Sequence, residues 1–194
     1  WSGKGQKAAE EIFRQTYPAI SAHFEPYRTA LIKRLDQGEH FWELRSCSYW
    51  EEFEQPKVII PAIINAPQYA SDDSGMFSND KTSICIAEHP YYLLGILYYL
   101  LGILNSRLMW WFITQTASAK QGGFYECKPM YVGQIPIPER RDDEKITPLV
   151  QALLVRKAAG EAVAELEAQI DAAVYRLFGL VTAEIGVVDP TVSF

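Results

Sequence analysis

Hydrophobic positions are densest in one stretch near the middle of the chain. Residues 91–97 read YYLLGIL, and residues 98–104 repeat the same seven letters. A seven-residue repeat is nearly two helical turns, so a helix that carries it keeps its faces aligned to within about 20°. The apolar run pauses at Asn105, Ser106 and Arg107 and then resumes as far as Ile113. We therefore expect one helix over residues 91–113, buried on most sides. Its leucine stripe would contain Leu93, Leu97, Leu100, Leu104 and Leu108.

A membrane span is the competing interpretation of this stretch, and its length argues against it. The uncharged part, residues 91–106, is shorter than the roughly 18–20 residues that a bilayer requires. Arg107 then interrupts the run, and four tyrosines are unusual in a lipid core. We expect a core helix and no membrane partner. Each glycine in a helix costs roughly 1 kcal/mol relative to alanine, so another element should pack closely against Gly95 and Gly102.

The segments before this helix alternate between helical and strand-like patterns. Helical signals run over residues 8–16 and 18–37. Pro26 either kinks the second segment or opens another helix, and Gly38 is the C-terminal residue. Five apolar side chains share one face of the second segment: Ile20, Phe24, Tyr27, Leu31 and Leu35. Two β-rich runs, 57–61 and 82–87, predict strands. Residues 65–81, between them, have the composition of a loop.

The pattern after the central helix ends in a long helical region. Residues 124–132 predict another short element, and the IPIP sequence at 135–138 predicts an extended exit. From Thr147, which we expect to be the cap, the pattern is helical until Gly179. Without a break at Gly160, residues 148–178 would form a helix of roughly 45 Å, at about 1.5 Å per residue. The stripe of this helix would contain Val163, Leu166, Ile170, Val174 and Leu177. We expect the tail to residue 194 to be irregular.

These patterns together predict an α+β fold, in which a small mixed sheet with packed helices is followed by a long C-terminal helix. The 194 residues suit one domain plus an extension, or two small domains. The chain begins at Trp1 without an initiator methionine and shows no secretory signal, so we expect it to be part of a longer protein. Cys47, Cys85 and Cys127 lie far apart and predict isolated, reduced thiols in a cytoplasmic protein.

The charge is unevenly distributed along the chain. The net charge is −6, from 18 basic and 24 acidic residues, which disfavours a general polyanion binder. Residues 1–90 hold 9 basic and 13 acidic groups, whereas residues 91–141 hold 5 basic and 2 acidic groups, a net charge of +3. The second region could therefore form a basic face on an acidic protein.

The usual enzyme signatures are missing from the sequence. It contains no GxGxxG, GxxxxGK[ST], HExxH or GxSxG pattern, no zinc-type cysteine cluster, and no Asn-Pro-Pro-aromatic motif. Glu51, Glu52 and Glu54 are more typical of a solvated acidic turn than of a metal site. We therefore predict no catalytic residue, no metal site and no cofactor in this chain.

The remaining candidate chemistry is nucleic-acid binding. Arginine, asparagine, glutamine and lysine read base edges, while serine hydroxyls and backbone N–H groups hold phosphates. Two adjacent glycines let a loop backbone approach a ligand closely. The candidate DNA-binding residues are Lys57, Asn105, Ser106, Arg107, Lys120, Gln121, Gly122, Gly123 and Tyr125. The competing interpretation is a helix interruption followed by an ordinary glycine turn.

Three strings in the chain resemble a known family. They are PKVIIP at 56–61, LGILNSRL at 101–108 and GQIPIP at 133–138. They look like the TaqI-like C-terminal specificity domain, which is the target-recognition part of type IIG restriction–modification enzymes. The opening, from YPAI at 17–20 to RLDQG at 34–38, resembles the segment that joins a methyltransferase domain to this module. Residues 166–180 resemble the helical end of such proteins.

The resemblance implies a role in sequence-specific DNA target recognition. It implies a parent protein that methylates adenine with S-adenosylmethionine held upstream, and it leaves a nuclease and magnesium open. Residues 1–40 would be a connector from the methyltransferase domain, 41–141 the recognition domain, and 142–194 the long helix and tail. The partners would be double-stranded DNA and the upstream domain. Asn105 and Ser106 match the family's Leu-Asn-Ser motif, although both residue types can also cap a helix. The alternative function is a protein-interaction module that docks through its long C-terminal helix.

Overall fold

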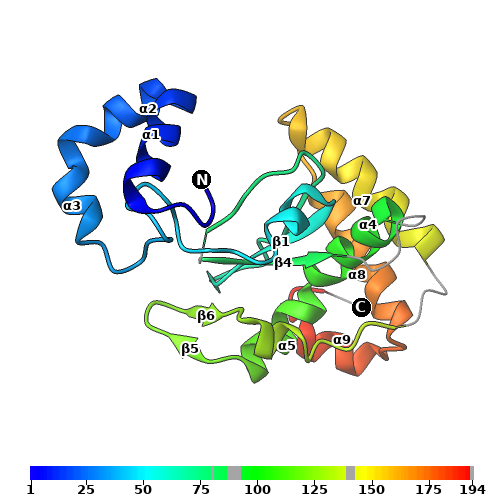
Figure 1. Ribbon diagram of the computed structural model, residues 1–194. Helices are drawn as coiled ribbons and strands as arrows, with labels where there is room; N and C mark the ends of the chain where they lie inside the picture. Colours follow the sequence, from blue (N-terminus) through cyan, green and yellow to red (C-terminus); the bar gives the residue numbers. More distant parts are fainter. Residues whose placement is uncertain (80, 87–92, 139–142, 193–194) are drawn as a thin grey trace. The chain divides into compact units, whose positions relative to one another are not determined.

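A computed structural model describes residues 1–79, 81–86, 93–138 and 143–192, with the side chains of 93, 94, 143 and 144 outside the described set. The chain divides into two compact units, Trp1–Trp50 and Glu51–Phe194 (Figure 1). The predicted α+β class is confirmed, because helices and small antiparallel sheets occur in the same chain.

The first unit is a small helical body around an aromatic core. Its elements are α1 (Gln6–Thr16), α2 (Pro18–Phe24), the 3-10 turn η1 (Glu25–Tyr27) and α3 (Arg28–Ile32). Phe13 stacks on Trp42 with ring centroids 4.7 Å apart. The predicted first helix is confirmed. The second is divided by η1, because Pro26 has no N–H for a helical hydrogen bond, and it ends at Ile32 instead of residue 37.

A three-stranded antiparallel sheet lies near the start of the second unit. It follows the 3-10 turn η2 (Trp50–Glu54), and its order is β3-β1-β4. The strands are β1 (Lys57–Pro61), β3 (Ala70–Asp72) and β4 (Thr82–Ile86). Both predicted strands are confirmed, and residue 87 lies outside the described residues. The prediction of a mixed sheet is wrong, because β1 pairs antiparallel with both neighbours. The prediction of a loop throughout 65–81 is also wrong, since β3 pairs with β1 despite its weak strand composition.

A second antiparallel sheet connects the first to the helices. Its strands are β2 (Ile63–Ile64), β5 (Ala119–Lys120) and β6 (Phe124–Glu126), in the order β2-β6-β5. The short helix α6 (Pro129–Val132) follows β6. The element predicted within residues 124–132 is therefore two elements, a strand and a helical turn.

The central apolar stretch forms two helices instead of one. They are α4 (Leu93–Leu104) and α5 (Arg107–Thr116), and the two axes are bent by 61°. The break occurs because Ser106 leaves helical geometry and caps α5, where its hydroxyl accepts from the Met109 N–H at 3.3 Å. The expected burial of α4 is confirmed at Leu97 and Leu104. The continuous leucine stripe to Leu108 is wrong, because that residue belongs to the second helix.

Close packing at Gly102 is confirmed. A Cβ atom at this position would lie 2.6 Å from Cγ2 of Ile146 and 2.9 Å from Cγ2 of Val150. Both residues belong to α7 (Asp143–Ala158), which also approaches the other glycine, since the Thr147 hydroxyl donates to the Gly95 carbonyl at 3.3 Å. The repeated heptad thus places both of its glycines against the same helix.

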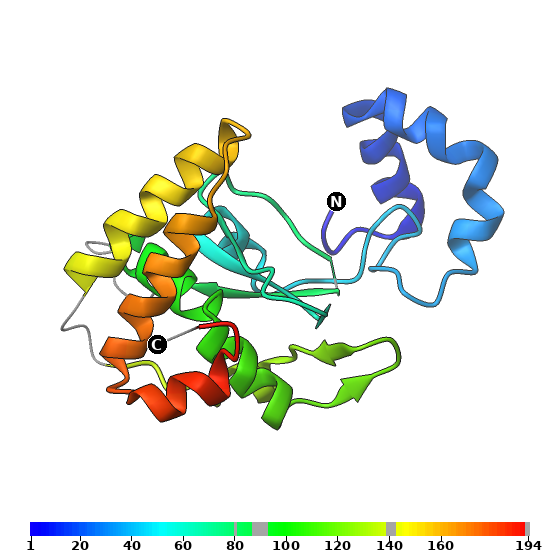
Figure 2. The same ribbon diagram turned by 180° about the vertical axis from the view of Figure 1, so that it is seen from behind.

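The C-terminal region is a helical hairpin followed by a short helix (Figure 2). The predicted long helix is wrong, because α7 ends at Ala158 and α8 (Ala164–Leu177) packs back against it. Gly160 has a φ of +73°, which lets the chain reverse at low cost. Thr147 lies inside α7 and is not its cap. The tail predicted as irregular contains α9 (Thr182–Val188).

No single helix in the described part of the chain has both the length and the apolar composition of a membrane span. Only the bent pair of α4 and α5 meets that test, and only when the two are taken together.

Candidate nucleic-acid interface

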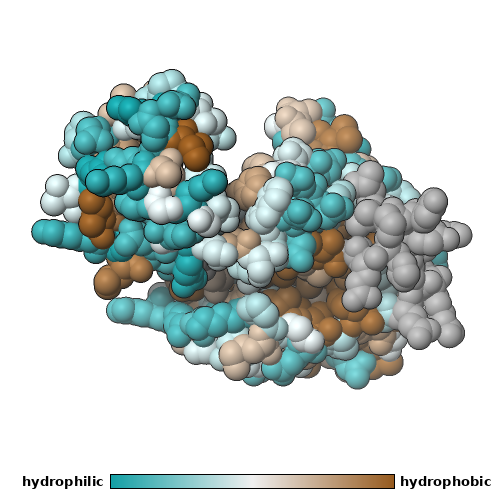
Figure 3. Space-filling model, viewed as in Figure 1, coloured by the Kyte–Doolittle hydropathy of each residue, from teal (hydrophilic) through white to brown (hydrophobic). Residues whose placement is uncertain are grey.

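The β5–β6 hairpin (residues 119–126) presents polar side chains and backbone together at the surface. Lys120, Gln121, Gly122 and Gly123 are all exposed. The two glycines have φ values of +81° and +77°, a region that favours glycine, so the turn depends on both. The hairpin extends from the C-terminal end of α5 (Figure 1). Its surface is mostly hydrophilic, whereas hydrophobic patches lie nearer the centre of the unit (Figure 3).

Two lysines share the carboxylate of Glu126, the last residue of β6. Nζ of Lys120 and Nζ of Lys128 each lie 3.1 Å from Oε1 of Glu126. The lysine side chains are 41% and 56% exposed, and the glutamate side chain is 14% exposed. The hydrogen bonds from Lys120 and then Lys128 hold the pKa of Glu126 below its ordinary value. Glu126 and Lys128 are not among the residues predicted from the sequence, although the alternation of side-chain direction along β6 puts residues 124 and 126 on the same face.

Tyr125 attaches the hairpin to α5. Its ring meets the Trp110 ring edge to face, with centroids 5.6 Å apart. Because side chains alternate along a strand, Tyr125 points to the opposite face of β6 from Phe124 and Glu126. The aromatic ring at the exposed surface is instead that of Phe124, which is 37% exposed. We therefore assign Tyr125 to positioning the hairpin.

The structure places Lys57 inside the protein. The residue is fully buried, and its ammonium donates to the Phe53 carbonyl and pairs with the Asp72 carboxylate. Asp72 also accepts from the Ser74 and Met76 N–H groups at 3.0 and 2.8 Å. Lys57, followed by Ser74, holds the pKa of Asp72 well below its usual range. We remove Lys57 from the candidate site, because its charge is compensated in the core.

Asn105 and Ser106 also maintain the fold. The Asn105 side chain accepts from the Tyr69 N–H and donates to the Tyr69 carbonyl, both at 3.1 Å. Ser106 is buried and caps α5. The Leu-Asn-Ser motif is therefore structural here, because it ends α4, begins α5 and ties that junction to the segment before β3.

Arg107 lies at the opposite end of α5 from the hairpin. Its side chain is half-exposed, with Nη1 2.5 Å from Asp189 Oδ1 and Nε 3.4 Å from Asp171 Oδ2. The Arg107 backbone N–H also donates to Asp171 Oδ1 at 2.8 Å. Asp189, followed by weaker effects of Asp171, raises the pKa of the guanidinium. The ten residues of α5 separate Arg107 from the hairpin by about 15 Å. The predicted donors thus do not share one face.

Arg107 borders a cavity of about 1040 Å³ among α4, α7, α8, α9 and residues 67–70. Its charged lining residues balance, with three cations (Arg107, Lys157 and Arg176) and three acids (Glu167, Asp171 and Asp189). Most of the other lining is apolar. Such a cavity offers no net attraction to a phosphate backbone, so the hairpin is the better candidate interface.

Metal-ligating side chains are dispersed among the residues that the structure describes. In those residues, no three His, Cys, Asp or Glu side chains are grouped closely enough to hold a metal ion. Cys47, Cys85 and Cys127 are free thiols, as the sequence predicts.

Comparison with known proteins identifies the family. The model of the TaqI-like C-terminal specificity domain matches residues 20–137, more than half of the chain. The chain therefore belongs to the family of TaqI-like C-terminal specificity domains. The matched region includes both sheets, α4, α5 and the β5–β6 hairpin, and it ends before α7. No curated protein matches the chain significantly.

Proposed function

We propose that this chain recognises a target sequence in double-stranded DNA through the β5–β6 hairpin, within a restriction–modification enzyme. Membership of a specificity-domain family supports the DNA-recognition role. The observation that carries the location is the exposed hairpin, with two half-exposed lysines beside Glu126 and two glycines at its tip. The major groove of B-form DNA admits a two-stranded β-ribbon, and the hairpin is such a ribbon.

Each part of the hairpin has a distinct role in this proposal. Lys120 and Lys128 contact phosphates, because ammonium groups on flexible stems suit the DNA backbone. Gln121 faces base edges, where a glutamine side chain can pair with adenine N6 and N7. Gly122 and Gly123 let the backbone approach the groove. Tyr125, packed on Trp110, fixes the direction of the ribbon.

We place the methylation chemistry in an upstream adenine methyltransferase domain of a longer cytoplasmic protein, of the type IIG class. That domain would hold S-adenosylmethionine, and magnesium would be needed only if a nuclease is present. The family match and the lack of catalytic motifs in the printed sequence support this division of labour. In this setting residues 1–40 connect the two domains.

The alternative function, a scaffolding module that docks through a long C-terminal helix, has less support. It depended on a continuous helix, whereas α7 and α8 pack against each other and against α4. Leu166, on the stripe that a partner would have covered, is already buried within the chain. No other observation specifically favours this function.

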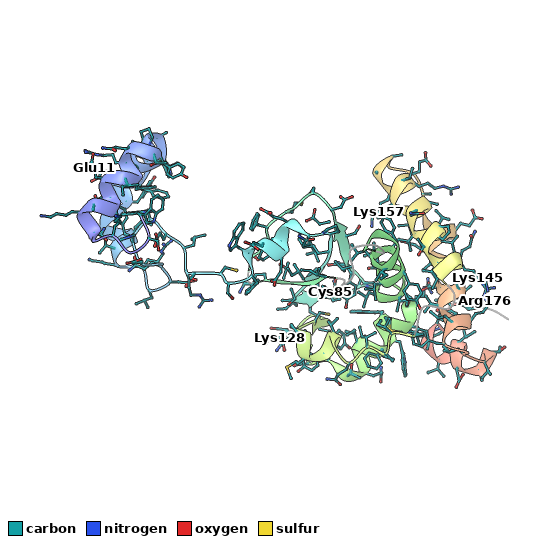
Figure 4. All side chains as sticks on the ribbon, turned by 45° about the vertical axis from the view of Figure 1, so that its right-hand side comes forward. Glu11, Cys85, Lys128, Lys145, Lys157 and Arg176 are labelled. Carbon is teal, nitrogen blue, oxygen red and sulfur yellow. The ribbon has the colours of Figure 1, made fainter. Side chains whose placement is uncertain are left out.

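The test is the affinity of a lysine-free hairpin for DNA. The double variant Lys120→Ala, Lys128→Ala is compared with wild type by fluorescence anisotropy on a labelled duplex of mixed sequence at low salt. We expect binding to weaken about tenfold, at roughly 0.7 kcal/mol for each exposed ionic contact. Lys145→Ala, Lys157→Ala is the control, because it removes the same charge from exposed positions on α7 (Figure 4). An equal loss in both variants would show that the hairpin has no special role.

A further inference from the structure

Glu126 is a negatively charged residue at the centre of the proposed DNA-binding surface. A carboxylate there opposes phosphate binding, because like charges repel across an interface. Its oxygen Oε1 is 3.1 Å from both lysine ammonium groups that the proposal assigns to phosphates. The arrangement therefore needs an explanation beyond simple attraction for DNA.

The three charged groups differ in how firmly they are held. Glu126 lies on β6, the central strand of its sheet, opposite Ile63 of β2. Its backbone N–H donates to the Ser118 carbonyl at 3.1 Å. The two lysines end flexible four-carbon stems, and their side chains are about three to four times as exposed as that of Glu126. The backbone of Glu126 is thus held in the sheet, and the lysines on their longer, more exposed stems can leave the carboxylate when another anion competes.

We propose that Glu126 competes with DNA phosphates for Lys120 and Lys128, and thereby suppresses the binding of duplexes that lack the target sequence. This inference rests on the proposed function of the hairpin. Non-specific binding depends almost entirely on phosphate contacts, so each lysine contributes less to non-specific binding while Glu126 competes for it. On a target duplex, contacts to the bases compensate for the broken ion pairs. Glu126 is then a specificity-determining residue, because it weakens the binding of duplexes that lack the target sequence.

The experiment removes the charge and keeps the shape. Glu126→Gln is titrated with a labelled duplex of mixed sequence at low salt, beside wild type. We expect about three- to tenfold tighter binding, equivalent to one ionic contact of 0.7–1.4 kcal/mol by the relation of tenfold to 1.4 kcal/mol. We also expect a steeper salt dependence, since in wild type salt weakens the internal ion pairs as well as the DNA contacts.

Two matched variants separate this effect from general electrostatics. Glu161→Gln makes the same change in net charge at an exposed position between α7 and α8, and should change affinity less than twofold. In the Lys120→Ala, Lys128→Ala background, Glu126→Gln should give a clearly smaller gain than in wild type, because only the direct repulsion between the carboxylate and the phosphates is then relieved. Circular dichroism melting of each variant checks that the hairpin change leaves the fold intact.

The outcomes are distinguishable. If wild type binds duplex DNA and Glu126→Gln gains no more than Glu161→Gln, the competition is refuted and the proposed function stands. A gain that is as large in the lysine-free background also refutes it, since the effect would then not pass through the lysines. If no variant binds duplex DNA at low salt, the proposed function itself fails.

Discussion

The buried pair of Lys57 and Asp72 gives the sharpest prediction about stability. In Lys57→Met the ammonium is lost, while the apolar stem that fills the core is largely kept. The Asp72 side chain is only 4% exposed, so its carboxylate stays buried. In the variant this buried carboxylate has lost its counter-ion. The Phe53 carbonyl also loses its donor.

The structure sets the size of the effect. Removing one partner of a buried ion pair typically costs about 3–5 kcal/mol. Asp72 keeps three donors, the Ser74 N–H at 3.0 Å, the Ser74 hydroxyl at 2.6 Å and the Met76 N–H at 2.8 Å. These bonds continue to stabilise the ionised form, so we expect a loss near the lower end, about 3 kcal/mol in the free energy of unfolding.

Urea denaturation followed by circular dichroism measures this loss. The double variant Lys57→Met, Asp72→Asn should recover at least about 1 kcal/mol relative to Lys57→Met, because the unpaired buried charge is removed. Lys157→Met is the control, since it makes the same substitution at an exposed position of α7 and should change stability by less than about 0.5 kcal/mol. If Lys57→Met is as stable as this control, the ion pair does not contribute as the structure implies.

Two further predictions concern the packing of α4. Gly102→Val should destabilise the protein by about 1–3 kcal/mol in urea denaturation, because the added Cβ would overlap the Ile146 side chain. A neutral effect on stability would contradict the close contact between α4 and α7. Asn105→Ala should cost about 1–3 kcal/mol, because it leaves the Tyr69 backbone groups without their partner. For Asn105→Ala, hydrogen exchange should accelerate at the Tyr69 amide, and unchanged exchange there would count against the assignment.

Local sequence patterns were sufficient for the elements that depend on local chemistry. The first helix, β1 and β4 follow from apolar periodicity, and Gly102 was expected to be a close contact because a glycine inside a helix is costly. The reversal of the chain at Gly160 is harder to predict from the sequence. The predicted stripe, from Val163 to Leu177, does not show whether the helix continues across Gly160, and only the packing of α7 and α8 on each other and on α4 shows that the chain turns back.

Within the candidate site, the sequence predicts the turn of the β5–β6 hairpin and little else. Gln121, Gly122 and Gly123 were recognised from composition and are exposed in the structure. The burial of Lys57 could not be predicted, because its partner Asp72 lies fifteen residues away on a strand that the sequence does not signal. Glu126 was overlooked because a lone acid among apolar residues resembles any solvated strand position until both lysines are seen beside it.

Strand pairing in the second sheet, β2-β6-β5, holds the hairpin in place. β6 pairs with β5 on one side and with β2 on the other, and β2 follows β1 after a single residue. Hydrogen bonds therefore connect the hairpin to the segment that leaves the first sheet. The Tyr125 contact with Trp110 adds an anchor on α5. A ribbon held in this way can enter a groove with little loss of conformational entropy, which favours binding.

The salt dependence of DNA binding by the Lys120→Ala, Lys128→Ala variant tests the central claim most directly. The slope of log affinity against log salt falls by about 0.9 for each phosphate contact that is lost from B-form DNA. We therefore predict that the slope becomes shallower by about 1.8 in this variant, and that it stays unchanged in Lys145→Ala, Lys157→Ala. Identical slopes for wild type and the hairpin variant would contradict the assignment of the β5–β6 hairpin as the DNA-binding surface.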